Sequence, residues 1–120
     1  EIVWQSETPP AYGITVFDGE TGYSPRGGVS AYDLRTGERR WTRTFPQIPT
    51  SAITVSGGRL YLGTGDQVIH VLDAQTGESL VAHKLKYRPR GAVEPSPVLR
   101  LDERRIVVGT YQEIICLEVE

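Results

Sequence analysis

The side chains with most potential for chemistry are acidic, and their spacing decides whether they hold a metal ion. The stretch DGETG at residues 18–22 places oxygen-bearing side chains at alternate positions, as a calcium loop does. It lacks the twelve-residue spacing and the closing bidentate glutamate of such loops. Asp66 and Asp102 fall in predicted hairpin turns, where we expect them to be solvated. We therefore predict turn roles for these residues and no metal site.

Histidine and cysteine are the next candidates for metal binding or nucleophilic chemistry. His70 lies in VIHVL and His83 in VAHKL, and neither has further ligands at metal-binding spacing. We expect a buried or edge-strand imidazole at each position. Cys116 is the only cysteine, so no internal disulfide forms, and alternation along IICLEV predicts a buried, structural thiol. We predict no catalytic residue in this chain.

One basic cluster, HKLKYRPR, could bind a ligand. Lys86, Tyr87, Arg88 and Arg90 form a candidate ligand loop for phosphate or carboxylate groups, or for a planar group that stacks on the ring. The alternative interpretation is that the lysines protect the edge of an outermost strand against pairing. The whole chain has 13 Lys and Arg against 15 Asp and Glu, a net charge of −2, which disfavours a nucleic-acid partner.

The composition is typical of one soluble globular domain. The chain has 120 residues, 38% hydrophobic and 23% charged. No apolar run approaches the roughly 18 residues of a membrane span. The N-terminal EIVWQSETPP has neither the basic nor the apolar region of a signal peptide. With no methionine anywhere, this start indicates an excised piece or a processed chain.

Short apolar runs alternate with turn signals, which predicts an all-β domain. The runs are ITVF (14–17), AITV (52–55), RLYLG (59–63), VIHVL (68–72), RRIVVG (104–109) and EIICLEV (113–119).

The sequence also repeats itself. Residues 14–33, 53–73 and 98–118 align with one another, and in the first two copies a turn and a fourth strand follow, at residues 38–45 and 78–85. Four antiparallel strands per roughly 40 residues are typical of a propeller blade.

The Asp-x-x-Thr-Gly stretch that precedes each fourth strand is interpreted as a turn device. The aspartate can accept hydrogen bonds from the next backbone N–H groups, the threonine hydroxyl can add another, and the glycine permits a positive φ. Its members are Asp33, Thr36 and Gly37 in the first copy and Asp73, Thr76 and Gly77 in the second. The motif is repeated because each blade needs one such turn.

A longer pattern resembles a known family. Ala31, Asp33, Gly37 and Trp41 match the Ala-x-Asp-x-x-x-Gly-x-x-x-Trp docking motif of the quinoprotein propellers, which include the pyrroloquinoline quinone (PQQ) dehydrogenases and non-catalytic relatives. The resemblance implies that Trp41 packs between neighbouring blades on a peptide plane of the next motif. In the second copy Val81 stands in place of the Trp, so there we expect that contact to be weakened or lost.

The first residues extend this pattern. EIVW carries Glu1 and Trp4 at the offset of Glu38 and Trp41. We therefore expect three blade-equivalents, at about 1–37, 38–77 and 78–120. Because propellers close with about four to eight blades, three blades do not make a ring. Either the remaining blades of a parent propeller or a second copy, in a homodimer, would complete it.

The resemblance is compatible with three classes of function. One is a PQQ-like propeller module that serves as a binding or interaction scaffold for a protein or peptide. The alternative is a section of a PQQ-dependent alcohol or sugar dehydrogenase, with PQQ and calcium as cofactors, because residues 27–80 look most like its late blades. A small self-assembling propeller with a ligand on its axis is a third. The sequence has no Asn and no Cys pair, which favours the scaffold. By resemblance, the location is periplasmic or extracellular.

Overall fold

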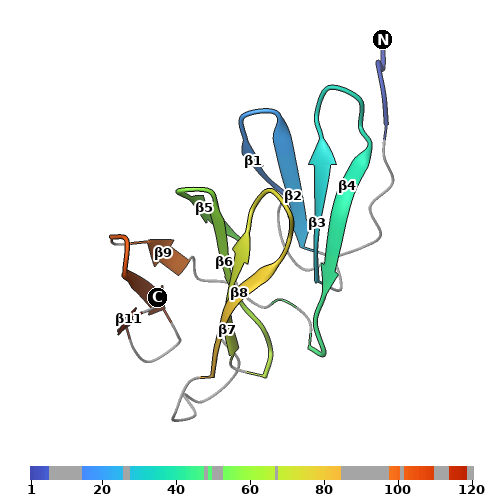
Figure 1. Cartoon of the computed structure of the whole chain (residues 1–120). Helices are drawn as coiled ribbons and strands as arrows, with labels where there is room; N and C mark the ends of the chain where they lie inside the picture. Colours follow the sequence, from blue (N-terminus) through green and yellow to red (C-terminus); the bar gives the residue numbers. More distant parts are fainter. Residues whose placement is uncertain are drawn as a thin grey trace.

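The fold is described from a computed structural model. The described residues are 1–5, 15–25, 28–47, 49, 53–66, 68–84, 98–100, 102–109 and 114–118. Within these ranges all of the regular structure is β-strand, and the strands form three antiparallel sheets that stand side by side (Figure 1). The predicted all-β class and the antiparallel blades are confirmed.

Each sheet is a meander in which neighbours along the chain are neighbours in space. The first sheet contains β1 (Val16–Asp18), β2 (Thr21–Pro25), β3 (Gly28–Asp33) and β4 (Arg39–Thr44). The second contains β5 (Thr54–Ser56), β6 (Arg59–Gly63), β7 (Val68–Asp73) and β8 (Ser79–Lys84). The third contains β9 (Val98–Arg100), β10 (Arg105–Gly109) and β11 (Ile114–Glu118).

The outer hairpins of the first two sheets share one register. Ala31 on β3 lies opposite Trp41 on β4, and Val71 on β7 lies opposite Val81 on β8. Both ladders shift immediately after these pairs, because the outer strand contributes one additional residue there. Such a bulge bends a strand and increases its twist. The same irregularity therefore orients the outer strand of both blades.

The core lies between the sheets. One cluster joins the first sheet to the second, and its buried members are Tyr23, Val29, Ala31, Ile53, Leu60, Leu62, Leu72 and Ala74. Another joins the second sheet to the third through Tyr61, Ile69, Val71 and Ile106. Strand alternation sends successive side chains of β6 and β7 to opposite faces. The second sheet is consequently buried on both faces, like a blade between two neighbours.

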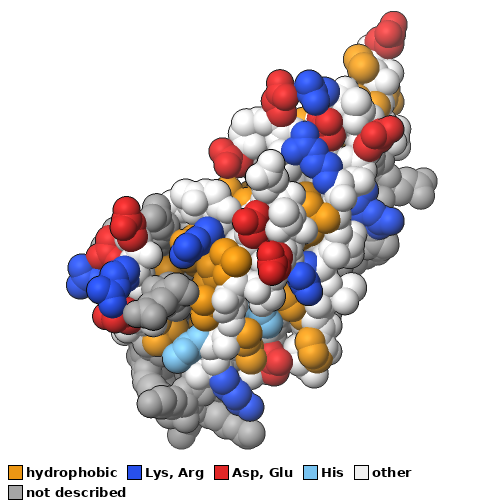
Figure 2. All heavy atoms as spheres, viewed as in Figure 1, with side chains coloured by type: hydrophobic (Ala, Val, Ile, Leu, Met, Phe, Trp, Pro, Cys, Tyr) orange, Lys and Arg blue, Asp and Glu red, His pale blue; other side chains and the backbone are white. Residues whose placement is uncertain are grey.

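The surface carries charges of both signs. On the face shown in Figure 2, acidic and basic side chains are interspersed. Among the described residues of this face there is no broad single-sign field of the kind that attracts a polyanion. No helix in the described part of the chain is long and apolar enough to cross a membrane.

Two glycines with the same backbone geometry allow a controlled test of the packing. Gly58 and Gly77 have φ of 75° and 77°. A Cβ added to Gly58 meets nothing within 4 Å, whereas one added to Gly77 would lie 2.5 Å from Cε3 of Trp41. Only Gly77 is therefore covered by an indole from the neighbouring sheet.

We expect Gly77→Ala to destabilise the protein more than Gly58→Ala. Both substitutions carry the cost of a left-handed backbone, about 1 kcal/mol. Gly77→Ala adds overpacking against Trp41, about 1–3 kcal/mol more. The free energy of unfolding, measured by urea denaturation, checks the difference. Equal losses for the two variants would contradict the indole packing.

Candidate functional site

The turn that follows β3 is built from the predicted motif residues. The Oδ1 atom of Asp33 accepts the backbone N–H of Arg35 at 2.9 Å. The hydroxyl of Thr36 accepts the backbone N–H of Glu38 at 3.2 Å. Gly37 has φ of 79° and donates its N–H to the Asp33 carbonyl at 2.7 Å. The side chains of this motif are thus engaged in closing the hairpin.

The turn after β7 has the same construction. Oδ1 of Asp73 accepts the N–H groups of Gln75 and Thr76 at 2.8 and 3.1 Å. The Thr76 hydroxyl accepts the N–H of Glu78 at 3.2 Å. This turn is also tied to the neighbouring hairpin of its sheet, because the Ala74 N–H donates to the Gly58 carbonyl at 3.0 Å. The turn therefore presents its backbone in a fixed position to the adjacent sheet.

Trp41 contacts this turn across the boundary between the first two sheets. Its indole Nε1–H donates to the Ala74 carbonyl at 3.2 Å, and its ring lies against Gly77. A hydrogen bond has a direction that apolar packing does not have. Trp41 therefore fixes how the two blades sit relative to each other.

Two further donors, not predicted from the sequence, reach the same turn. The Tyr23 hydroxyl donates to the Ala74 carbonyl at 3.3 Å, and Arg43 Nε donates to the Gly77 carbonyl at 2.7 Å. A carbonyl has two lone pairs, so Ala74 can accept from both Tyr23 and Trp41. Trp41 and Arg43 are two residues apart on one strand and therefore lie on the same face of it. This spacing is the feature of the sequence that could have predicted Arg43 as a second contact to the neighbouring sheet.

Trp4 makes the corresponding contact one blade earlier. Its Nε1–H donates to the Leu34 carbonyl at 2.9 Å, and Leu34 follows Asp33 as Ala74 follows Asp73. Trp4 is 38% exposed. In the second copy, Val81 packs on the apolar cluster that holds Ile106, so an apolar contact stands where the first copy has an indole.

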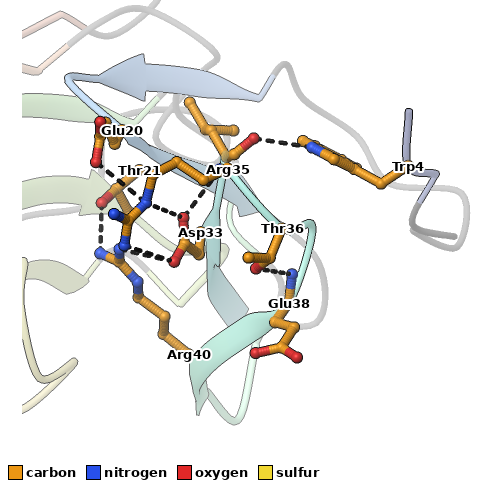
Figure 3. Close-up of polar contacts among 9 residues, drawn as sticks. Trp4, Glu20, Thr21, Asp33, Arg35, Thr36, Glu38 and Arg40 are labelled. Atoms are coloured by element: carbon orange, nitrogen blue, oxygen red, sulfur yellow. Dashed lines mark hydrogen bonds and ion pairs between the residues drawn. The ribbon is translucent and has the colours of Figure 1, made fainter. Parts of the chain in front are cut away.

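A charged network surrounds the first turn (Figure 3). Arg35 pairs with Glu20 at 3.3 Å and with Asp33 at 3.4 Å, and Arg40 pairs with Asp33 at 3.4 Å and donates to the Thr21 hydroxyl at 2.8 Å. The Arg35 backbone N–H, followed by its side chain and Arg40, lowers the pKa of Asp33. The second turn has Gln75 and Leu80 at the two arginine positions and still forms. The turn therefore does not need the charged network in order to form.

A second polar group is buried at the opposite end of the same boundary. Thr64 is fully buried and donates its hydroxyl to Asp66, while its Oγ1 lies 3.1 Å from Nε2 of His70. His70 is 8% exposed, and its ring packs against Phe45, the residue after β4, with ring centroids 4.2 Å apart and ring planes tilted by 34°. Burial lowers the pKa of His70, although the Asp66 carboxylate opposes this. Thr64 and His70 thus lie buried with hydrogen-bond partners, and Asp66 is partly exposed at the edge of the group.

Asp66 and Asp102 are both hydrogen-bonded rather than simply solvated. Asp102 accepts the N–H groups of Arg104 and Arg105 at 2.9 Å each, and the Arg105 side chain lowers its pKa. A shallow depression beside this turn is lined by paired charges, with Arg104 3.0 Å from Glu118 and Arg105 2.6 Å from Asp102. Among the described residues, no three acidic, histidine or cysteine side chains gather as metal ligands.

The expected burial of Cys116 is wrong. Its thiol is exposed on β11, because no described strand pairs with the outer edge of β11. Alternation alone predicts which face a side chain occupies but not whether that face is covered. The candidate ligand loop with Lys86, Tyr87, Arg88 and Arg90 lies outside the described residues.

Antiparallel sheets that pack side by side through this docking motif define a class, the PQQ-like β-propeller repeat proteins. The chain belongs to the family described as outer membrane protein assembly factor BamB, which it matches over residues 1–120. No curated protein matches the sequence.

Solved structures share the fold. BamB from Moraxella catarrhalis superposes with a TM-score of 0.70 at 24% identity, over 89% of this chain and 33% of that one. The europium-containing methanol dehydrogenase gives 0.74 at 21% identity, over 91% and 22%. The computationally designed Ika4 protein gives 0.69 at 19% identity, over 88% and 64%. This chain therefore spans about a third of the first of these proteins and less than two thirds of the others.

We expect loss of the Trp41 indole to destabilise the protein in two separable steps. Trp41→Phe removes the hydrogen bond to Ala74 and costs about 1 kcal/mol. Trp41→Ala also removes the packing on Gly77 and costs about 3 kcal/mol or more. Circular dichroism in urea measures both. Trp4→Phe is the control and should cost less, because Trp4 is more exposed; an equal cost would argue against this difference.

Burial of neutral His70 predicts loss of stability in mild acid. The pKa of His70 in the folded protein is lowered below its unfolded value of about 6.5. Its contribution to stability is therefore complete above that value and is lost as the pH falls toward the folded pKa. Urea unfolding between about pH 7.5 and 5 measures the slope.

His70→Gln should flatten this slope, because glutamine does not titrate in the range. His83→Gln, on the neighbouring strand, is the matched substitution against which the slope of His70→Gln is compared. A slope that persists in His70→Gln contradicts the prediction.

Proposed function

We propose that this chain is a propeller module that acts as a binding and interaction scaffold within a larger ring. The observation that carries the proposal is the use of the motif residues. The Asp33 and Asp73 oxygens bind the backbone of their own turns, and the Trp41 indole holds the neighbouring blade. The side chains that define the family pattern are thus engaged in closing the turns and in joining the blades.

The remaining polar groups support the same choice. Thr64 is fully buried and His70 nearly so, and their side chains are engaged with each other and with the partly buried Asp66. Calcium beside PQQ would need several acidic or amide ligands, and among the described residues no three acidic, histidine or cysteine side chains gather. This supports the scaffold over a metal–quinone centre.

The partner in this proposal is a protein or peptide. The family description, an outer membrane protein assembly factor, supports a protein partner and a periplasmic or extracellular location. The module is completed by further blades, either of a parent chain or of a second copy. Lys86, Tyr87, Arg88 and Arg90 would provide carboxylate contacts in a loop between blades, where propellers place ligand contacts.

A direct test compares an acidic peptide with the quinone. A fluorescein-labelled Glu-Glu-Tyr-Glu-Glu peptide should bind the full chain saturably, with an affinity that falls as salt is raised. Arg88→Ala should weaken binding several-fold, as expected for loss of a charge-assisted contact. Fluorescence anisotropy measures the affinity. Arg39→Ala removes an equal charge from the exposed β4 and should have little effect.

The second arm titrates PQQ with calcium and follows the quinone absorbance. Stoichiometric PQQ binding, together with no saturable peptide binding, would overturn the scaffold and favour the alternative, a section of a PQQ-dependent alcohol or sugar dehydrogenase that contributes to the quinone pocket.

A further inference from the structure

Three carboxylates hold equivalent positions in the three sheets. Asp33, Asp73 and Glu118 are the last residues of β3, β7 and β11. Each lies opposite the first residue of the preceding strand of its sheet, on β2, β6 and β10 respectively. The three side chains therefore stand at the same corner of their sheets, and a difference in their ionic partners is a difference between matching sites.

Two of these carboxylates bind a guanidinium group of their own sheet. Asp33 Oδ2 pairs with Arg35 and with Arg40, both at 3.4 Å (Figure 3). Glu118 Oε1 pairs with Arg104 at 3.0 Å. A guanidinium group presents several N–H donors in a fixed plane, which suits it to a carboxylate oxygen. This corner of a sheet thus accepts arginine where the chain supplies one.

Asp73 has no such partner within the described part of the chain. Its Oδ1 atom accepts two backbone N–H groups of the second turn, and no described arginine or lysine forms an ion pair with either of its oxygens. Arg59 lies directly opposite Asp73 on β6 and does not pair with it. Because Asp73 is partly exposed, its Oδ2 atom is a charged acceptor that a partner can reach.

The two cationic positions of the first turn are changed in the second. Gln75 stands two residues after the aspartate, where the first turn has Arg35. Leu80 stands where the first turn has Arg40, since each is the additional residue of the bulge on its outer strand. Leu80 is 44% exposed. A carboxylate without a cation and an exposed apolar side chain are thus combined on one hairpin.

These positions stay accessible when a neighbouring blade is in place. The first sheet packs against the second, and yet the Arg35 and Arg40 side chains are 65% and 40% exposed. The equivalent positions of the second sheet, Gln75 and Leu80, should therefore remain open beside a complete neighbour in a longer ring.

We propose that the second turn is a docking site for an arginine of a partner protein. The guanidinium group of that arginine pairs with Asp73 Oδ2, and its aliphatic stem packs on Leu80. The incoming side chain takes the place that Arg40 has in the first turn. Arginine is preferred to lysine because a guanidinium group is more weakly hydrated and has a fixed fork of donors. The site is separate from the loop at 86–90, so the inference goes beyond the proposed function and does not depend on it.

Titration with a dipeptide tests the site. In amide NMR spectra of the full chain at low salt, acetyl-Leu-Arg-amide should shift the signals of Gln75 and Leu80 saturably. The signal of Arg35, in the first turn, should stay unchanged. One exposed ion pair contributes little, so the dissociation constant is expected on the order of millimolar. Acetyl-Leu-Gln-amide is the control ligand and should give no saturable shift.

Variants of the two turns separate the charge from the fold. Asp73→Asn keeps an oxygen acceptor for the turn and removes the charge, so it should weaken binding several-fold. Leu80→Arg supplies an internal guanidinium group, as Arg40 does in the first turn, and should block the dipeptide. Arg40→Leu combined with Arg35→Gln gives the first turn the composition of the second and should create another site there.

A second measurement needs no ligand. Leu80→Arg should raise the urea midpoint more in the wild-type background than in the Asp73→Asn background, because only the former retains the carboxylate. This comparison is a double-mutant cycle, so effects of the arginine on other neighbours cancel.

Several results would overturn the proposal: no saturable shift in the wild-type chain, equal binding of the two dipeptides, equal shifts at both turns, unchanged binding in Asp73→Asn, or equal effects of Leu80→Arg in the two backgrounds. None of these changes the comparison of the acidic peptide with PQQ, which concerns another surface. Failure of the arginine site and failure of the scaffold function are therefore distinguishable.

Discussion

The rest of the structure depends on the hydrogen bond from the Trp41 indole to the Ala74 carbonyl. Apolar layers such as these sheets can slide over one another at little cost, since burial is proportional to area and has no direction. A donor and an acceptor at 3.2 Å restrict that sliding. The Asp73 turn holds the acceptor, the bulge orients the donor strand, and Gly77 leaves room for the ring. Several features of the sequence thus serve one contact.

The parts of the fold that could be predicted from the sequence are those that repeat. The Asp, Thr and Gly of each turn act on backbone groups a few residues away, so their spacing contains the information that is needed. Strand positions followed from short β-branched runs between turns. Strand ends were less accurate: the first strands of the two complete sheets were expected at 14–17 and 52–55 and are Val16–Asp18 and Thr54–Ser56.

Contacts between different blades could not be predicted from local spacing in the sequence. Tyr23 and Arg43 reach the second turn from 51 and 34 residues away, and no local spacing signals such a pair. The group of Thr64, Asp66 and His70 depends on Phe45 from the neighbouring sheet. For Cys116 the predicted burial failed for a related reason: it assumed a covering element that β11 lacks in the described structure.

The two faces of the second sheet are held differently, and this has a consequence for how the fold opens. Toward the first sheet, Trp41, Tyr23 and Arg43 donate to backbone carbonyls, whereas the described contacts toward the third sheet are apolar, through Ile106 and Leu117. A boundary that lacks such directional hydrogen bonds is expected to open first. The first two sheets should behave as one unit in hydrogen exchange, and the third should exchange its amides earlier. In a ring built from such pieces, the boundary between the second and third sheets would open locally more often, and the boundary at Trp41 would stay closed.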